Sequence, residues 1–114
     1  MKVFAKTLDG NSACLGVVSE VKCTVKLNSD PPIDALELYF ESVDENGSDF
    51  VRSNFFPGQS LEILIVKNDG LIVFRVPRAI PLQGILSLNR PFTFTSDLNF
   101  EMSLFRSEIN IPLL

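Results

Sequence analysis

The sequence contains no histidine and no tryptophan. Without histidine, the chain lacks the residue that activates most serine and cysteine nucleophiles. It also lacks a usual ligand of catalytic zinc and non-haem iron. No glycine-rich loop matches a phosphate-binding motif, since Gly58 and Gly84 each stand alone. These absences argue against an enzyme, and we expect neither catalytic residues nor a cofactor.

Cysteine is also scarce, with only Cys14 and Cys23 present. Two cysteines do not make a disulfide framework. We expect two half-buried thiols, while a hairpin that pairs the two segments would permit a bridge, so their bonding stays open.

Positive charge and long apolar runs are missing as well. The ten Lys and Arg residues are scattered and the net charge is −4, which argues against nucleic acid and an anionic membrane as partners. The longest apolar runs, 63–66 and 71–74, are four residues each, far shorter than a membrane helix. The N-terminus has no signal-peptide pattern. We expect a soluble protein, cytoplasmic by default, with no other indication of its location.

What the chain does contain is apolar residues. Hydrophobic residues make up 46% of its 114 residues and charged residues 21%. This length predicts a single domain over 1–114, and the apolar fraction excludes a disordered tail.

Apolar and polar residues alternate with a period of two in four segments, which are 21–27, 36–41, 92–95 and 98–104. This pattern predicts antiparallel strands with one wetted face. Turn residues divide the chain at regular intervals, and no segment has an amphipathic stripe over three helical turns. The sequence therefore predicts an all-β antiparallel β-sandwich, Ig-like or jelly-roll in type, with eight or nine short strands.

The segment 61–76 differs because Leu61–Val66 and Leu71–Val76 are apolar on nearly both faces. The tight-turn sequence Lys67–Gly70 lies between them and predicts a β-hairpin. A hairpin that is apolar on both faces is either central in the fold or covered by another chain.

The first 67 residues also carry a series of short motifs. Met1-x-x-Phe4-x-Lys6-Thr7-Leu8-x-Gly10 resembles the first hairpin of ubiquitin, and echoes follow at 21–22, 31–32, 38–40, 44–47 and 60–61. The resemblance implies an alternative fold, a ubiquitin-like β-grasp with a C-terminal β extension. Its central helix would fall on Val18–Leu27, where the strict alternation favours a strand.

The chain has more apolar residues than a small core easily buries, and this surplus indicates a contact surface. Adjacent residues of a strand point to opposite faces, so one of Phe55 and Phe56 is expected at the surface. The apolar end of the chain, 109–114, is expected to dock as an edge strand, where Pro112 is tolerated. The expected interface residues are Phe55, Phe56, Leu64, Val66, Ile72, Phe74, Ile109, Ile111, Leu113 and Leu114.

The function that these observations favour is a non-catalytic structural or adaptor subunit. It would act by protein–protein contact through an apolar sheet face or edge, supplemented by strand addition. The partner is protein, either another copy or a different chain, and we expect a homo-oligomer or a part of an assembly.

Two alternatives stay open. One is a small acidic inhibitor or immunity-type protein that binds a basic partner site. The other is a β-sandwich module that binds a ligand or carbohydrate, although Tyr39 is the only Tyr and sugar sites favour Tyr and Trp platforms. The oxygen-rich loop 44–49 offers candidate calcium ligands in Asp44, Asn46 and Asp49, but its spacing is that of an ordinary hairpin turn and no metal is expected.

Overall fold

The computed structural model describes residues 1–27, 30, 33–82, 84–96, 98, 100–108 and 111–113. Across these residues the chain forms eight strands and one helix. In chain order they are β1 (Lys2–Thr7), β2 (Ser12–Lys26), β3 (Ile33–Val43), α1 (Glu45–Asn54), β4 (Gln59–Lys67), β5 (Gly70–Pro81), β6 (Phe92–Ser96), β7 (Glu101–Glu108) and β8 (Ile111–Leu113).

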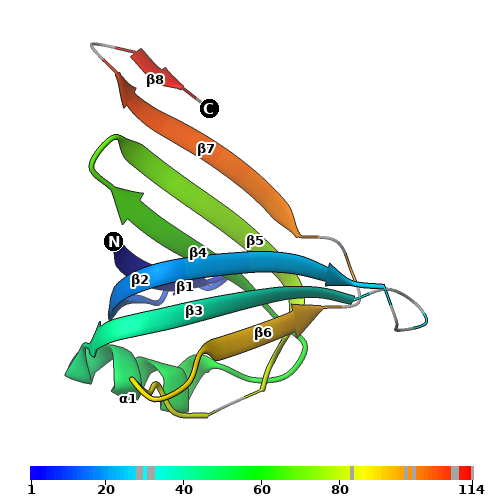
Figure 1. Cartoon of the computed structure of the whole chain (residues 1–114). Coiled ribbons are helices and arrows are strands. Elements are labelled where there is room, and N and C mark those ends of the chain that lie inside the picture. The colour runs from blue at the N-terminus through cyan, green and yellow to red at the C-terminus, as the bar shows by residue number, and fades with distance from the viewer. Residues whose placement is uncertain are drawn as a thin grey trace.

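The strands join into one antiparallel sheet that closes on itself. Its order is β4-β1-β2-β3-β6-β5-β7-β8, and β4 also pairs with β5. The strands β4, β1, β2, β3, β6 and β5 therefore form a closed ring, which we call the ring (Figure 1). The strands β7 and β8 lie outside it, and we call them the sheet extension.

The all-β antiparallel prediction is confirmed. The two separate sheets of the predicted sandwich are not found among the described pairings, because the β4–β5 pairing closes one sheet into a ring. Closure satisfies backbone groups that two open sheets would leave at their edges. The length of β5 makes it possible: Gly70 to Ala79 pair with β4, Gly70 to Arg75 also pair with β7, and Ile80 and Pro81 pair with β6.

The ubiquitin-like alternative is wrong. All but the last of the residues that would form its central helix lie in β2, which pairs with β3. The helix instead follows β3 and precedes β4. Alternating β-branched residues at Val21 and Val25 pack well on a pleated surface, and this local preference agrees with the strand.

The core fills the interior of the ring. Leu36 and Leu38 of β3 lie opposite Phe94 and Phe92 of β6, and all four are buried. On the other side of the ring, β1 and β4 contribute the buried residues Val3, Ala5, Ile63 and Ile65. Residues between these positions point outward, as the period of two requires.

The segment 44–49, expected as a hairpin turn, is instead the start of α1. The Asp44 side chain accepts a hydrogen bond from the backbone N–H of Asn46 at 2.9 Å and caps the helix. Gly47 lets the helix backbone approach β2 closely. A Cβ added there would lie 2.4 Å from the carbonyl oxygen of Cys14 and 2.6 Å from Leu15 Cα.

The predicted hairpin over 61–76 is confirmed, with Lys67 opposite Gly70 at the turn. The two cysteines are free thiols. Both lie on β2, and nine residues of extended strand separate them by about 30 Å at ~3.3 Å per residue. They are therefore too far apart to bridge.

A hydrogen bond ties the ring to the sheet extension. Asp34 of β3 is buried, and its carboxylate accepts a hydrogen bond from the backbone N–H of Phe100 at 2.6 Å. Phe100 directly precedes β7 and packs against the core. This contact fixes the point at which the chain leaves the ring.

Candidate functional site

The sheet extension begins where β7 pairs with the first half of β5. Gly70 to Arg75 of β5 lie opposite Arg106 to Glu101 of β7. The short strand β8 pairs with β7 and is the last strand of the sheet order. Figure 1 shows β7 and β8 projecting away from the ring. Both faces of β7 therefore lie beyond the six strands that enclose the core.

One face of β7 continues the inner face of β5 past the ring. Met102 lies opposite Phe74, and Leu104 lies opposite Ile72. Phe74 is only 4% exposed, whereas Met102 is 59% exposed and Leu104 is 41% exposed. The same face is thus buried where the ring covers it and exposed where the ring ends.

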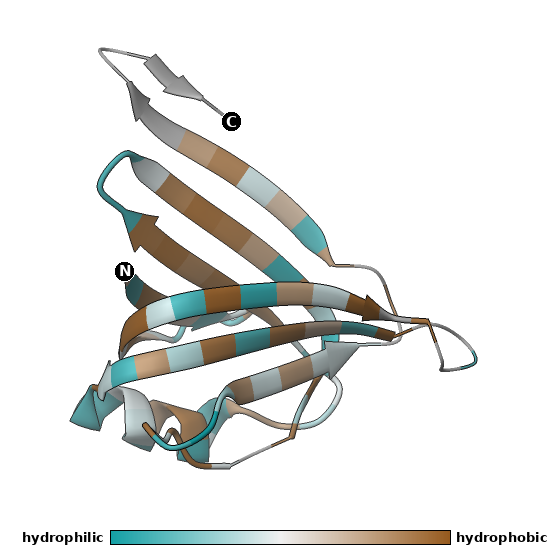
Figure 2. Cartoon of the chain, in the orientation of Figure 1, coloured by the Kyte–Doolittle hydropathy of each residue, from teal (hydrophilic) through white to brown (hydrophobic). Residues whose placement is uncertain are grey.

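The opposite face, which we call the outer face, is formed by the outward-pointing residues of β1, β4, β5 and β7. One row across these strands contains Phe4, Leu64 and Val73, and the next contains Val66, Leu71 and Phe105. Val66 is 40% exposed, and the other residues of the second row are half-buried. Figure 2 shows the continuous apolar stretches of β4 and β5 that form its centre.

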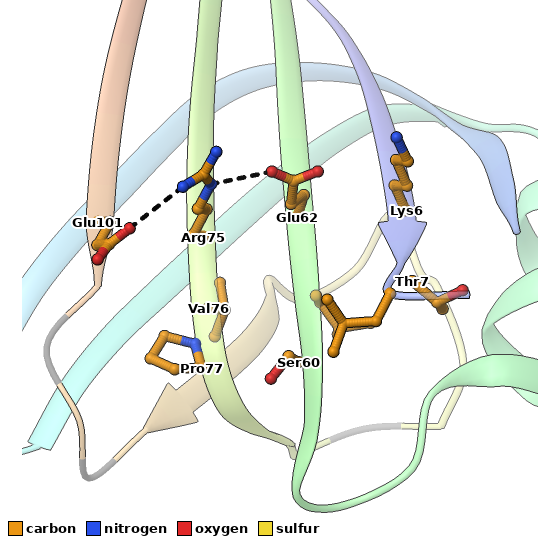
Figure 3. Close-up of a pocket in the computed structure, with 10 residues that line it drawn as sticks. Lys6, Thr7, Ser60, Glu62, Arg75, Val76, Pro77 and Glu101 are labelled. Atoms are coloured by element: carbon orange, nitrogen blue, oxygen red, sulfur yellow. Dashed lines mark hydrogen bonds and ion pairs between the residues drawn. The ribbon is translucent and has the colours of Figure 1, made fainter. Parts of the chain in front are cut away.

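A row of charges crosses the same four strands next to the apolar rows. Lys6, Glu62, Arg75 and Glu101 lie opposite one another in that order. Arg75 Nε lies 3.1 Å from Glu62 Oε2, and Arg75 Nη1 lies 3.5 Å from Glu101 Oε2 (Figure 3). We call these four residues the charged row. Because Arg75 and Glu101 are largely in water and Glu62 is partly so, each ion pair adds little to folding stability.

A shallow pocket of about 430 Å³ lies beside the charged row. Thr7, Ser60 and Pro77 line its other side, together with Leu8, Leu61 and Val76 (Figure 3). It presents charges of both signs over an apolar floor. Within the described ranges, no three His, Cys, Asp or Glu side chains gather as metal ligands.

The expected interface residues fall into different environments. Leu64 and Val66 lie on the outer face, and Ile72 is half-buried against the core. Phe74 is in the core and cannot make a surface contact, so its assignment to an interface is wrong. The ring is the reason, because β4 and β5 enclose one of the two apolar faces of their hairpin.

The Phe55–Phe56 pair divides as adjacent strand residues would. Phe56 is 55% exposed. Phe55 packs against Phe50, Phe92 and Phe94, with ring centroids 5.5–6.0 Å apart. Phe55 is therefore half-buried in an internal aromatic cluster, and Phe56 is the more exposed of the two.

The apolar end of the chain forms the predicted edge strand on this domain. Ile111 and Leu113 belong to β8, opposite Glu108 and Arg106 of β7. Ile109 and Leu114 lie outside the described residues.

The candidate calcium ligands do not converge. Asp44 caps α1 through the backbone of Asn46, and Asp49 forms an ion pair with Arg52 one helical turn later. A helix start arranges these side chains around its axis and does not aim them at a common point. The candidate site at Asp44, Asn46 and Asp49 is therefore not formed.

The exposure of Met102 and Leu104 and the existence of the charged row do not follow from the sequence. The alternation over 98–104 predicted a half-buried strand, but a pattern along one strand does not say whether its neighbour covers it. The charged row can be recognised only once the register of four strands is known. Its members come from positions 6, 62, 75 and 101, and no local pattern links them.

Cys23 lies on β2 opposite Leu36. The surrounding protein partly desolvates its thiol and raises the pKa, and the Asp34 carboxylate raises it further. The neutral thiol is therefore favoured, although the residue keeps an exposed surface.

The helix that the structure describes is too short to cross a bilayer. No known family, curated protein or solved structure matches this chain.

Proposed function

We propose that this chain is a non-catalytic structural or adaptor subunit that works by protein–protein contact through its sheet extension. The observation that carries the proposal is the exposure of Met102 and Leu104 on a strand outside the ring. Val66 adds an exposed apolar side chain on the outer face. Met102 and Leu104 lie two residues apart on one face of β7, and exposed apolar side chains that lie together in this way are typical of contact surfaces.

Burial of these side chains in a contact would contribute free energy to association. Removing apolar area from water contributes about 25 cal/mol per Å², so covering a partly exposed Met or Leu contributes about 1–2 kcal/mol. Association also costs translational and rotational freedom. Several such side chains are needed together, and the described part of β7 supplies the exposed Met102 and Leu104 and the half-buried Phe105.

The edge of the sheet supports a second mode of contact. The strand β8 is the last in the order, and no described strand pairs with its other side. An unpaired edge accepts a strand from another chain through backbone hydrogen bonds. Pro112 has no N–H to donate, so an added strand would form its backbone hydrogen bonds with the residues before and after Pro112.

The test is a triple variant, Val66→Ser, Met102→Ser and Leu104→Ser, which removes exposed apolar area from both faces. We expect the wild-type chain to have a mass above that of a monomer in light scattering, and the variant to shift toward the monomer. The matched control changes Val25, Leu27 and Leu88 to Ser, because these three are exposed elsewhere on the molecule. A wild-type chain that stays monomeric at high concentration overturns the proposal, as does a variant that assembles like the wild type.

One observation supports a second candidate function, a ligand-binding module. The pocket beside the charged row combines Lys6 and Arg75 with Glu62 and Glu101, which suits a small zwitterionic ligand. A thermal-shift screen with amino acids and dipeptides tests it, since a ligand that binds only the folded state raises Tm. An Arg75→Ala variant should lose that shift. The acidic-inhibitor alternative gains no such support on this face, where carboxylates alternate with basic groups.

A further inference from the structure

We propose that the partner is a second copy of this chain, and that two outer faces pack around a two-fold axis parallel to their strands. This inference rests on the proposed contact function and names a partner for the outer face, to which Val66 belongs. Met102 and Leu104 lie on the opposite face of β7 and stay outside this particular contact. The observation behind it is the order of signs in the charged row. From β1 to β7 the row runs positive, negative, positive, negative.

A homodimer with a two-fold axis packs the same surface of each copy against itself. When two sheet faces meet, that axis can run along the strands or across them. An axis across the strands that lies on the charged row places each charge against the same residue of the other copy. Lys6 would then face Lys6 and Glu62 would face Glu62, which is repulsive at all four positions.

An axis along the strands reverses the order of the row in the second copy. Lys6 then faces Glu101 of the second copy, and Glu62 faces Arg75 of the second copy. The other two contacts follow by symmetry, so all four positions bring opposite charges together. The charged row is therefore self-complementary in one of the two orientations only, and complementary charges set the register of an interface.

The same axis keeps the apolar rows together. The first apolar row ends at Ser103 on β7, so its reversed copy places Phe4 against Ser103 and Leu64 against Val73, which is only 9% exposed. In the second row Leu71 meets Val66. At the end of the second apolar row, Lys2 of one copy meets Phe105 of the other, an arrangement that suits a cation over an aromatic ring. The interface would then have an apolar centre beside a charged rim, as specific interfaces do.

The ends of the charged row are available for such contacts. Among the described residues, no carboxylate oxygen lies within 4.0 Å of Lys6 Nζ. Glu101 keeps a side chain that is 71% exposed beside Arg75. These two residues are the pair that the two-fold axis brings together.

The size of the face sets the expected strength. The stretch that the four strands share is limited by the six residues of β1, about 20 Å at ~3.3 Å per residue. Four strands spaced by about 4.8 Å therefore give a footprint of roughly 400 Å². This is at the low end for specific complexes. We therefore expect a dimer that dissociates on dilution and weakens as salt screens the charged row.

The decisive experiment is charge complementation between two variants, Lys6→Glu and Glu101→Lys. In a homodimer of either variant, like charges face each other at both ends of the row. In a heterodimer of the two variants, opposite charges face each other again at both ends. Sedimentation velocity at low salt should show each variant alone dimerising about tenfold more weakly than the wild type. An equimolar mixture should recover wild-type affinity to within about threefold.

The mixture also separates the interface from effects inside one chain. Each substitution places a like charge beside Glu62 or Arg75 in its own monomer, and mixing does not remove that repulsion. Only a contact between copies explains recovery in the mixture. Lys67→Glu is the matched control, because it makes the same charge change at the hairpin turn, on the opposite face of β4. It should leave dimerisation unchanged.

A mixture that associates no better than either variant alone overturns this inference. The proposed contact function survives that result if the triple variant of Val66, Met102 and Leu104 still loses assembly. A wild-type chain that is monomeric throughout overturns both. Loss of association in the Lys67→Glu control to the same degree as in Lys6→Glu also overturns the inference, because it would make net charge the cause.

Discussion

The ring and the sheet extension are built from the same kind of strand, yet their apolar residues have opposite environments. Phe94 of β6 is fully buried, while Leu104 of β7 is 41% exposed. Both alternate with polar neighbours along their strands. The difference lies in what faces them, because β6 has the rest of the ring across from it and β7 has left the ring.

This contrast shows that alternation specifies a strand and its two faces, but not whether a face is covered. Whether a face is buried depends on whether the sheet closes into a ring, and ring closure is a property of the whole sheet. The ring contributes folding stability, and the extension contributes surface. Substitutions in the two regions should therefore differ in how much they change the free energy of unfolding.

The largest effect is expected in the ring. Phe94→Ala should lower the free energy of unfolding by about 3–5 kcal/mol, since it removes a fully buried ring and leaves a cavity. The matched change in the extension, Met102→Ala, should stay within about 0.5 kcal/mol. Urea denaturation of both variants measures the two values. Equal losses would break the division between the two regions.

The contact of α1 with the ring gives the next effect. Gly47→Ala should destabilise the protein by about 1–3 kcal/mol, because the added methyl group meets backbone atoms of β2 that cannot move aside. Gly84→Ala is the control, since a Cβ there meets nothing within 4 Å. Thermal unfolding should show a lower Tm for the first variant only. An unchanged Tm for Gly47→Ala would mean that the helix docks loosely.

A smaller effect is expected where the ring joins the extension. Asp34→Ala should cost about 1–2 kcal/mol, because it leaves the N–H of Phe100 without its acceptor. Asp34→Asn keeps an oxygen there and should recover much of the loss. Hydrogen exchange should quicken at Phe100 and along β7 while the amides of β3 and β6 stay protected. Uniform quickening would show that the two regions open as one unit.

The smallest effect concerns the Cys23 thiol. Because its pKa is raised by desolvation and by Asp34, half-maximal alkylation should require a pH above the ordinary thiol value of 9.0. The raised pKa favours the neutral thiol in the folded state, so its contribution to stability is present below the ordinary value and declines as pH rises through the raised one. Iodoacetamide rates on a Cys14→Ser background, folded and in denaturant, measure the shift. Identical pH profiles in the two states would contradict it.

Much of the fold follows from local pattern. The antiparallel strands and the hairpin at 61–76 follow from short stretches of residues. These features depend on neighbours in sequence. Alternation and turn chemistry are therefore enough to identify them.

The closed ring and the helix were not predicted. Closure depends on β1 meeting β4, two segments whose sequences carry no sign of each other. The helix begins Glu45-Asn46-Gly47-Ser48, which contains poor helix formers and reads as a turn. Its stability comes from the Asp44 cap and from burying Phe50 and Val51 in the ring, and both depend on the finished fold.

The candidate site was predicted in part. Leu64 and Val66 were expected at a surface and lie on the outer face, whereas Phe74 was assigned to the same surface and is core. The two faces of the hairpin are equally apolar, so composition could not say which one the ring encloses. The charged row emerged only when the strand registers placed its four residues side by side.

Closure of the ring also has a kinetic consequence. The pairing of Lys2 with Val66 joins residues about sixty positions apart in the sequence. Two hairpins and the helix lie in the chain between them. Contacts this distant in sequence cost a large amount of chain entropy before the contact itself stabilises the protein. We therefore expect refolding in milliseconds to seconds, with β1 and β4 meeting late. A newly made chain would carry an open sheet edge until the segment near residue 66 had emerged, and that interval is when it is most exposed to aggregation.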